Sequence, residues 1–207
     1  MAFFMIKNEY VAISLSLNTR FIIMARTLSN MLSLGTLAPE FSLLDTISKK
    51  KLSLKEVTLG APFVLMFICN HCPFVIHLHE GLKQLVDDLG EKGVRFMAIN
   101  SNDVEKYPED APQFMTKLFD ELGFDFPYFF DESQDIAIAY RAACTPDFYV
   151  FDEKKILVYR GEFDDSRPEN KVEVTGNPIR KAVDDLLNGH LNSDIQKPSM
   201  GCGIKWK

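Results

Sequence analysis

Residues 62–73 read Pro-Phe-Val-Leu-Met-Phe-Ile-Cys-Asn-His-Cys-Pro, an apolar run that leads directly into a Cys-x-x-Cys-Pro turn. The run from Phe63 to Ile68 is too short for a buried helix, so it predicts a central strand covered on both faces. Pro73 suits the first position of a helix, and apolar residues recur at helical spacing up to about Leu89. Cys72 then stands at the start of that helix, where unpaired N–H groups and the helix dipole stabilise a thiolate. The stretch therefore predicts a reactive thiol on a strand–turn–helix unit.

Further strands and helices follow this unit in an α/β order. We expect strands at residues 94–99, 127–130, 147–151 and 156–160, and helices at residues 112–122, 133–142 and 177–187. A right-handed crossover makes the strands at residues 63–68 and 94–99 parallel, and the strands at 147–151 and 156–160 form an antiparallel pair. A basic turn between residues 41–44 and 52–54 predicts a small hairpin near the start. The order β-α-β, then α, then β-β-α is the core of the thioredoxin fold. This is a three-layer α/β/α structure with a mixed central sheet, here carrying an N-terminal hairpin and an inserted helix.

Composition limits the classes of function that the chain can have. Its 207 residues, 46% of them hydrophobic, are enough for one domain with a full core. A net charge of −6 disfavours a nucleic-acid partner, and no apolar run is long enough to span a membrane. Four cysteines are too few for a disulfide-stapled secreted scaffold, so they indicate reactive or buried thiols in a reducing, cytoplasmic compartment.

The two ends of the chain differ from the body. Residues 1–23 are apolar-rich but interrupted by polar residues, which predicts a dispensable extension, with Met24 as an alternative start. A weak signal peptide is the alternative for this segment. We expect the domain itself to span residues 24–190. Residues 191–207 are expected to form a C-terminal tail that contains Cys202, and the chain from residue 188 onward is expected to be irregular.

Several motifs resemble the thioredoxin-like proteins of the peroxiredoxin (AhpC/TSA) superfamily. They are Ala38-Pro39-Glu40-Phe41, Cys69-Asn70-His71-Cys72-Pro73-Phe74-Val75, Cys144-Thr145-Pro146-Asp147-Phe148, Asp164-Asp165-Ser166-Arg167-Pro168 and the terminal stretch Gly201 to Lys207. The resemblance covers residues 24–207 and implies a peroxiredoxin-like hairpin before the thioredoxin core. It also implies thiol–disulfide oxidoreductase activity with an antioxidant or redox-homeostasis role. A cellular thiol would supply the electrons, and no cofactor is expected.

The register of the active turn identifies Cys72 as the nucleophile. In thioredoxins the nucleophilic cysteine lies five residues past a strand phenylalanine, and Phe67 to Cys72 repeats that offset. Val75 then occupies the usual resolving position, and Cys69 comes three residues too early for a thioredoxin pair. The peroxiredoxin pattern Pro-x-x-x-Thr-x-x-Cys is also broken, because Cys69 replaces the threonine and the proline is missing. The alternative for Cys72 is an inert structural thiol.

The partner of Cys72 stays open at this stage. Cys69 is either a resolving thiol or a buried apolar side chain, since free cysteine is commonly buried. Cys144 precedes Thr145-Pro146, and the resemblance implies a cis proline in a loop that faces the active cysteine. Cys144 is therefore either a partner or packing. Cys202, in the tail, either resolves Cys72 or has no role.

Other residues are expected to shape the site. His71 is expected to shield and tune the Cys72 thiol, and Thr145 and Pro146 to face it through the implied loop. Asn100, followed by Asn102 and Asp103, leaves the end of a parallel strand on the same rim.

Topology brings one more loop to this side of the sheet. Asp164, Asp165 and Arg167 follow a strand that returns toward the active turn, so they should emerge near it. Arg167 could stabilise a thiolate or bind an anionic substrate group, and an ordinary solvated loop is the alternative.

Two cysteines and nearby histidines also raise a zinc site. His77 and His79 lie on different helix faces, which does not suit a tetrahedral set, so we expect no metal. Three functions remain: a thiol–disulfide oxidoreductase acting on a thiol or disulfide protein, a thiol peroxidase acting on hydroperoxides, and a non-catalytic redox sensor or binding module. The sequence leaves monomer and dimer open.

Overall fold

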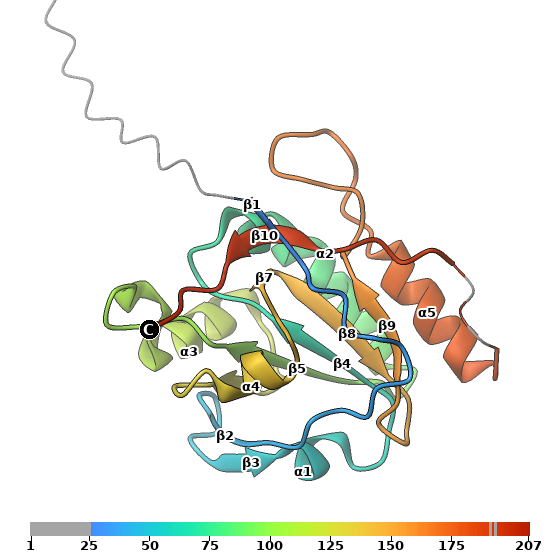
Figure 1. The fold of residues 1–207 in the computed structure, drawn as a ribbon, viewed down its shortest axis with the longest axis horizontal. Helices are drawn as coiled ribbons and strands as arrows, with labels where there is room; N and C mark the ends of the chain where they lie inside the picture. The colour runs from blue at the N-terminus through green and yellow to red at the C-terminus, as the bar shows by residue number, and fades with distance from the viewer. Residues whose placement is uncertain (1–25, 191, 193) are drawn as a thin grey trace, which may run out of the picture.

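A seven-stranded mixed sheet forms the centre of the protein (Figure 1). The computed structural model describes residues 26–190, 192 and 194–207, so the expected extension at 1–23 lies outside the described residues. The sheet has the order β3-β2-β6-β5-β4-β8-β9. Its strands are β2 (Ser42–Asp45), β3 (Lys51–Ser53), β4 (Phe63–Phe67), β5 (Arg95–Asn100), β6 (Tyr128–Phe130), β8 (Asp147–Phe151) and β9 (Leu157–Gly161). The strands β4, β5 and β6 are parallel, whereas β8 runs antiparallel to β4 and β9 antiparallel to β8.

Helices cover both faces of this sheet. They are α1 (Leu54–Thr58), α2 (Pro73–Gly90), α3 (Pro112–Leu122), α4 (Asp135–Ala139) and α5 (Asn177–Leu187), with a short 3-10 helix, η1 (Pro108–Asp110). One core cluster joins Val64 and Met66 of β4 to α2, α3 and α5, and the other joins Phe63, Leu65 and Phe67 to α1 and α4. The alternation of side chains along β4 thus feeds two cores, which is the predicted three-layer α/β/α arrangement. No helix in the described part is long and apolar enough to cross a membrane.

Strand β4 and the turn after it follow the sequence expectation closely. Every residue of β4 is buried, because β5 and β8 flank it and helices cover both faces. The chain then turns, and α2 begins at Pro73 with Cys72 at its N-cap in an extended conformation. The predicted position of Cys72 at a helix N-terminus is confirmed.

The N-terminal hairpin is also confirmed, since β2 and β3 pair antiparallel with Leu43 opposite Leu52. Helix α1, directly after the hairpin, was not expected. Its start has a capping box, in which Ser53 and Glu56 bond each other's backbone N–H groups. Ser-x-x-Glu is the sequence signature of such a start. The motif was therefore readable, although the helix is short.

A second, three-stranded sheet lies beyond the carboxyl ends of the parallel strands β4, β5 and β6. It has the order β1-β10-β7 and consists of β1 (Arg26–Leu28), β10 (Met200–Gly203) and β7 (Cys144–Thr145). Figure 1 shows β1 (blue) and β10 (red) side by side, although they come from opposite ends of the described chain. The prediction of an irregular tail is therefore wrong at residues 200–203. A short strand with two glycines has no apolar alternation to reveal it, and only its neighbours make it a strand.

Candidate active site

Two buried cysteines from opposite parts of the chain meet at the N-terminus of α2. Cys72 comes from the N-cap of α2 and Cys202 from β10, and both are free thiols. Their Sγ atoms lie 2.7 Å apart. In its thiol form Cys72 also donates to the carbonyl oxygen of Thr145, 3.1 Å away. A disulfide bond spans about 2.05 Å, so these two sulfurs need little movement to join.

The surroundings make the two thiols chemically unequal. Hydrogen bonds from Cys202 and then from Cys69 to the Cys72 sulfur hold the pKa of Cys72 well below its ordinary value, although burial opposes this. The same contact raises the pKa of Cys202, because the Cys202 thiol donates its proton in a hydrogen bond to the Cys72 thiolate. Burial adds to the rise. Cys72 is thus suited to be the nucleophile and Cys202 to be the proton donor beside it.

The other two cysteines have different neighbours. Cys69 is buried, and its Sγ lies 3.3 Å from the Thr145 hydroxyl. Burial is the main cause that raises the pKa of Cys69 well above its ordinary value. The Cys144 sulfur lies 3.7 Å from the carbonyl oxygen of Pro146, and burial likewise raises its pKa. The sulfur hydrogen bonds of Cys144 run to backbone carbonyls, which favours the packing interpretation for this residue.

Thr145 lies among Cys69, Cys72 and Cys202 and contacts all three. Its hydroxyl contacts Cys69, its carbonyl oxygen contacts Cys72, and its backbone pairs with Cys202 of β10. The Thr145–Pro146 peptide bond is cis, as the resemblance implied. The loop therefore does face the active turn, and it brings three thiols around one residue.

His71 contacts a carboxylate and an aromatic ring beside the active turn. Its Nδ1 lies 2.8 Å from a carboxylate oxygen of Asp110, and its ring stacks on Tyr107 with centroids 5.5 Å apart. The hydrogen bond to Asp110 is the main cause that raises the pKa of His71. When His71 is protonated, its positive charge one residue before Cys72 favours a negative charge in the active turn.

Asn100 lies at the end of β5, as expected, but it has no exposed surface. Its side chain is fully buried, where its amide donates to the carbonyl oxygen of Asp110 and its oxygen accepts from the Asn102 N–H. The polar residues at the end of β5 support the loop beneath the active turn because buried amides must find partners. Substrate contact by Asn100 is therefore excluded in this conformation.

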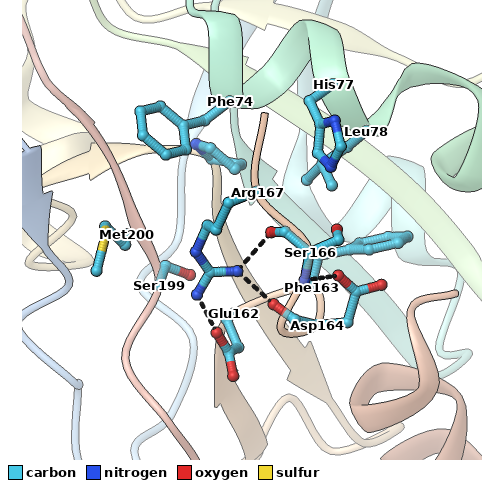
Figure 2. A pocket seen from close by; sticks show the side chains of 11 residues that line it. Phe74, His77, Leu78, Glu162, Phe163, Asp164, Ser166, Arg167, Ser199 and Met200 are labelled. Carbon is cyan, nitrogen blue, oxygen red and sulfur yellow. Dashed lines mark hydrogen bonds and ion pairs between the residues drawn. The ribbon is translucent and has the colours of Figure 1, made fainter. Parts of the chain in front are cut away.

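The loop after β9 reaches this side of the molecule, but its charges are engaged locally. Figure 2 shows the Arg167 guanidinium turned toward Glu162 and toward the backbone oxygens of Asp164 and Ser166. The Asp165 carboxylate is mostly exposed and pairs with Lys197. Arg167 lines a small pocket together with Phe74, Pro146 and Met200, which border the active turn. Its hydrogen bonds hold the loop, and none of them reaches a cysteine sulfur.

One cluster in the described part of the chain has the spacing of a metal site. Cys69, His71 and Asp110 each offer a ligand atom, and these atoms lie within 4.8 Å of one another. The Asp110 carboxylate, however, already accepts from the Asn70 N–H and the Asn102 amide and pairs with His71. Its lone pairs are thus directed at protein donors, and the arrangement is that of an ion pair. His77 and His79 are not members of the cluster.

Sequence reasoning missed Asp110, which is the buried acidic group at the centre of these contacts. It lies forty residues from Asn70, with which it bonds, and belongs to the three-residue helix η1. Its loop follows the carboxyl end of β5, which reaches the same rim as the active turn. The position of this loop on the same rim as the active turn could have indicated a site residue. The loop contains several acidic residues, however, and the sequence does not distinguish among them.

A second buried carboxyl, Asp147, leads to a prediction about stability. Burial raises the pKa of Asp147 to about 7, although Tyr149 donates to it at 2.9 Å. Between about pH 4 and pH 7 the folded protein keeps a proton that the unfolded chain has released. The free energy of unfolding therefore falls as pH rises across this window. We expect Asp147→Asn to remove this loss, on the order of 3 kcal/mol between about pH 4.5 and pH 8.

Urea unfolding of both proteins at these two pH values measures the difference. Asp120→Asn, which changes an exposed carboxyl on α3, is the matched control and should keep the wild-type pH dependence. Equal pH dependence in wild type and Asp147→Asn would contradict the prediction.

Comparison with known proteins agrees with this geometry. Residues 34–160 match the sequence profile of the AhpC/TSA family. The chain belongs to the AhpC/TSA family. None of the curated proteins compared with the chain matches it.

Solved structures extend the AhpC/TSA comparison. An uncharacterized conserved protein from Geobacillus kaustophilus is 54% identical, with a TM-score of 0.86 over 89% of this chain and 97% of that one. A hypothetical protein from Sinorhizobium meliloti is 42% identical, with a TM-score of 0.83 over 87% of this chain and 98% of that one. A putative thiol:disulfide interchange protein from Chlorobium tepidum is 18% identical, with a TM-score of 0.59 over 75% of this chain and 99% of that one.

The last likeness shows the fold alone, and it confirms the thioredoxin fold predicted from the sequence. Together, the family match and the neighbouring structures identify a thioredoxin-fold protein of the AhpC/TSA family.

Proposed function

We propose that this protein is a thiol–disulfide oxidoreductase whose redox pair is Cys72 and Cys202. The observation that carries the proposal is the 2.7 Å separation of the two sulfurs. Cys72 supplies the nucleophile, since its pKa is lowered by the hydrogen bonds that it accepts. Cys202, rather than the sequence neighbour Cys69, supplies the second thiol.

The reaction is a two-step exchange in which the protein is oxidised and the substrate reduced. The Cys72 thiolate attacks one sulfur of a substrate disulfide, which forms a mixed disulfide and releases the other sulfur as a thiolate. Cys202 then loses its proton and attacks the Cys72 sulfur, which forms the Cys72–Cys202 disulfide and releases the second substrate thiolate. The proton that Cys202 loses passes to one substrate thiolate, and the other substrate thiolate takes its proton from solvent. A cellular thiol then restores the dithiol form by the reverse exchange, and we place this cycle in the cytoplasm.

A second candidate is hydroperoxide reduction, and burial favours it. Cys72 has no exposed surface and Cys202 only 2%, so a small oxidant reaches the pair more easily than a folded protein does. The Cys72 thiolate would attack one oxygen of the peroxide O–O bond and become a sulfenic acid. The other oxygen would leave as water or an alcohol. Cys202 would then condense with the sulfenic acid and release water. This route ends in the same disulfide.

Mapping the first disulfide formed under mild oxidant by mass spectrometry tests the proposal. We expect the Cys72–Cys202 bond in wild type and in Cys144→Ser, which changes a buried thiol outside the pair. Cys72→Ser should lose disulfide reduction. A first bond between Cys69 and Cys72, or unchanged activity in Cys72→Ser, would contradict the assignment.

Activity assays separate the three functional classes. Disulfide reduction without rapid peroxide consumption supports the leading proposal, and rapid peroxide consumption favours the second candidate. A protein that forms the Cys72–Cys202 disulfide but shows neither turnover would be a redox sensor.

A further inference from the structure

We propose that Asp110 is a positioning residue for the redox pair. Its buried carboxylate holds the turn that carries Cys72 directly, and it holds the tail that carries Cys202 through Asn102. The inference rests on the proposed function, since it presumes that these two cysteines react with each other. Asp110 is fully buried in η1 and belongs to neither segment. Its contacts therefore fix two remote parts of the chain against a common point.

The first set of contacts holds the active turn. The backbone N–H of Asn70 donates to Oδ1 of Asp110 at 2.8 Å, and His71 Nδ1 lies 2.8 Å from Oδ2. Asn70 is further fixed because its side-chain amide donates to the carbonyl oxygen of Glu109 at 2.9 Å. Two consecutive residues before Cys72 are thus tied to η1. Such contacts restrict the position from which the Cys72 sulfur can approach a partner.

The second set of contacts runs to the C-terminal tail. The Asn102 amide donates to Oδ2 of Asp110 at 2.7 Å, and the Asn102 oxygen accepts from the backbone N–H of Lys205 at 2.8 Å. The carbonyl oxygen of Lys205 in turn accepts from the Asp103 N–H and from the Gln134 amide. Lys205 is three residues past Cys202, so the loop after β5 anchors the tail just beyond the reactive strand.

The charge of Asp110 matters as well as its hydrogen bonds. An uncompensated buried carboxylate is costly, and His71, whose Nδ1 lies 2.8 Å from Oδ2, supplies the opposite charge when it is protonated. The charged and titratable groups near this imidazole are Asp110 and Glu109 from η1, Tyr107 stacked on its ring, Lys205 above Tyr107, and the thiols of Cys69 and Cys72. Replacing Asp110 by a neutral residue should therefore release both the geometry and the proton of His71.

Asp110→Asn tests the inference, because asparagine keeps the shape and one acceptor but loses the charge. We expect the Cys72–Cys202 disulfide to form about tenfold more slowly with a small disulfide oxidant, since small misplacements of reacting groups are costly. We also expect the His71 imidazole pKa, followed by NMR, to fall by about one pH unit or more. A merely structural role would lower stability without slowing disulfide formation in the folded protein.

Two control variants, Glu109→Gln and Asp131→Asn, and one further test variant, Asn102→Ala, accompany Asp110→Asn. Glu109→Gln removes an exposed carboxylate 3.8 Å from the same nitrogen, and Asp131→Asn changes another buried carboxyl that bonds Ser101. Both should form the disulfide at nearly the wild-type rate. Asn102→Ala removes the link to the tail and one donor to the Asp110 carboxylate but keeps the contacts of Asp110 with Asn70 and His71. It should therefore slow disulfide formation with a much smaller change in the His71 titration than Asp110→Asn. If Asp110→Asn does not fold, Asn102→Ala still tests the positioning role of Asp110.

The outcomes are distinguishable from those of the proposed function. Wild-type protein that never forms the Cys72–Cys202 bond refutes the redox pair itself. Wild-type protein that forms it, with Asp110→Asn and Asn102→Ala forming it equally fast, refutes the positioning role of Asp110 alone.

Discussion

Gly201→Ala will separate strand β10 from strand β7 and destabilise the protein by about 3 kcal/mol. A Cβ atom at position 201 would lie 1.9 Å from the carbonyl oxygen of Thr145 and 2.6 Å from its carbonyl carbon. These are backbone atoms of the loop that carries the cis proline, so they cannot move aside as the end of a flexible side chain could. For a chain of this size the destabilisation corresponds to a fall in Tm of roughly 6–12 °C.

The same substitution will disturb the redox pair, because Gly201 precedes Cys202 on the strand that must shift. We expect slower formation of the Cys72–Cys202 disulfide and faster alkylation of Cys202 in the native protein. Gly90→Ala is the matched control, since nothing lies within 4 Å of a Cβ at that position. An unchanged Tm and an unchanged rate of disulfide formation in Gly201→Ala would show that β10 does not hold Cys202 in place.

Cys202→Ser will stop the exchange after its first step and lower turnover by about a hundredfold or more. Cys72 can still attack a substrate disulfide, but the sulfur that lies 2.7 Å away and would release the product is gone. The mixed disulfide on Cys72 should therefore persist, and intact-protein mass spectrometry will detect it. Rapid release of the substrate thiol in this variant would mean that Cys69 can resolve Cys72.

A comparison with Cys202→Ala separates the two roles assigned to Cys202. Serine keeps a hydrogen-bond donor close to the Cys72 sulfur, whereas alanine removes it. Both variants should accumulate the mixed disulfide, but only Cys202→Ala should raise the pKa of Cys72 strongly, as measured from the pH dependence of alkylation. The sign follows from the cause, since the hydrogen bond from Cys202 is the largest contribution that lowers this pKa. Equal alkylation profiles in the two variants would contradict that cause.

Much of the architecture was predictable because it depends on local patterns. The buried strand β4, the start of α2 at Pro73 and the bounds of α3, β8 and α5 follow from apolar runs, proline positions and helical spacing. The three strands of the second sheet did not follow. Strands β1, β7 and β10 have two to four residues each, and their pairing joins residues that are far apart in the chain.

The candidate site divides in the same way. The offset from Phe67 placed Cys72 at a helix N-terminus, and the structure bears this out. The partner was left open among Cys69, Cys144 and Cys202, because sequence separation says nothing of which sulfur returns to that place. Arg167 was expected near a thiol, yet its guanidinium is held by Glu162 and two backbone carbonyls.

The sequence by itself determined the strand–turn–helix unit and the cysteine that begins the helix, because hydrophobic period, proline geometry and helix-end electrostatics act over a few residues. The tertiary structure decided what that cysteine meets. Cys202 contacts it because Gly201 lets β10 approach the cis-proline loop and because Asn102 holds Lys205 beyond the strand. Those contacts join segments that are far apart in the chain, where only packing of the whole chain sets the distance.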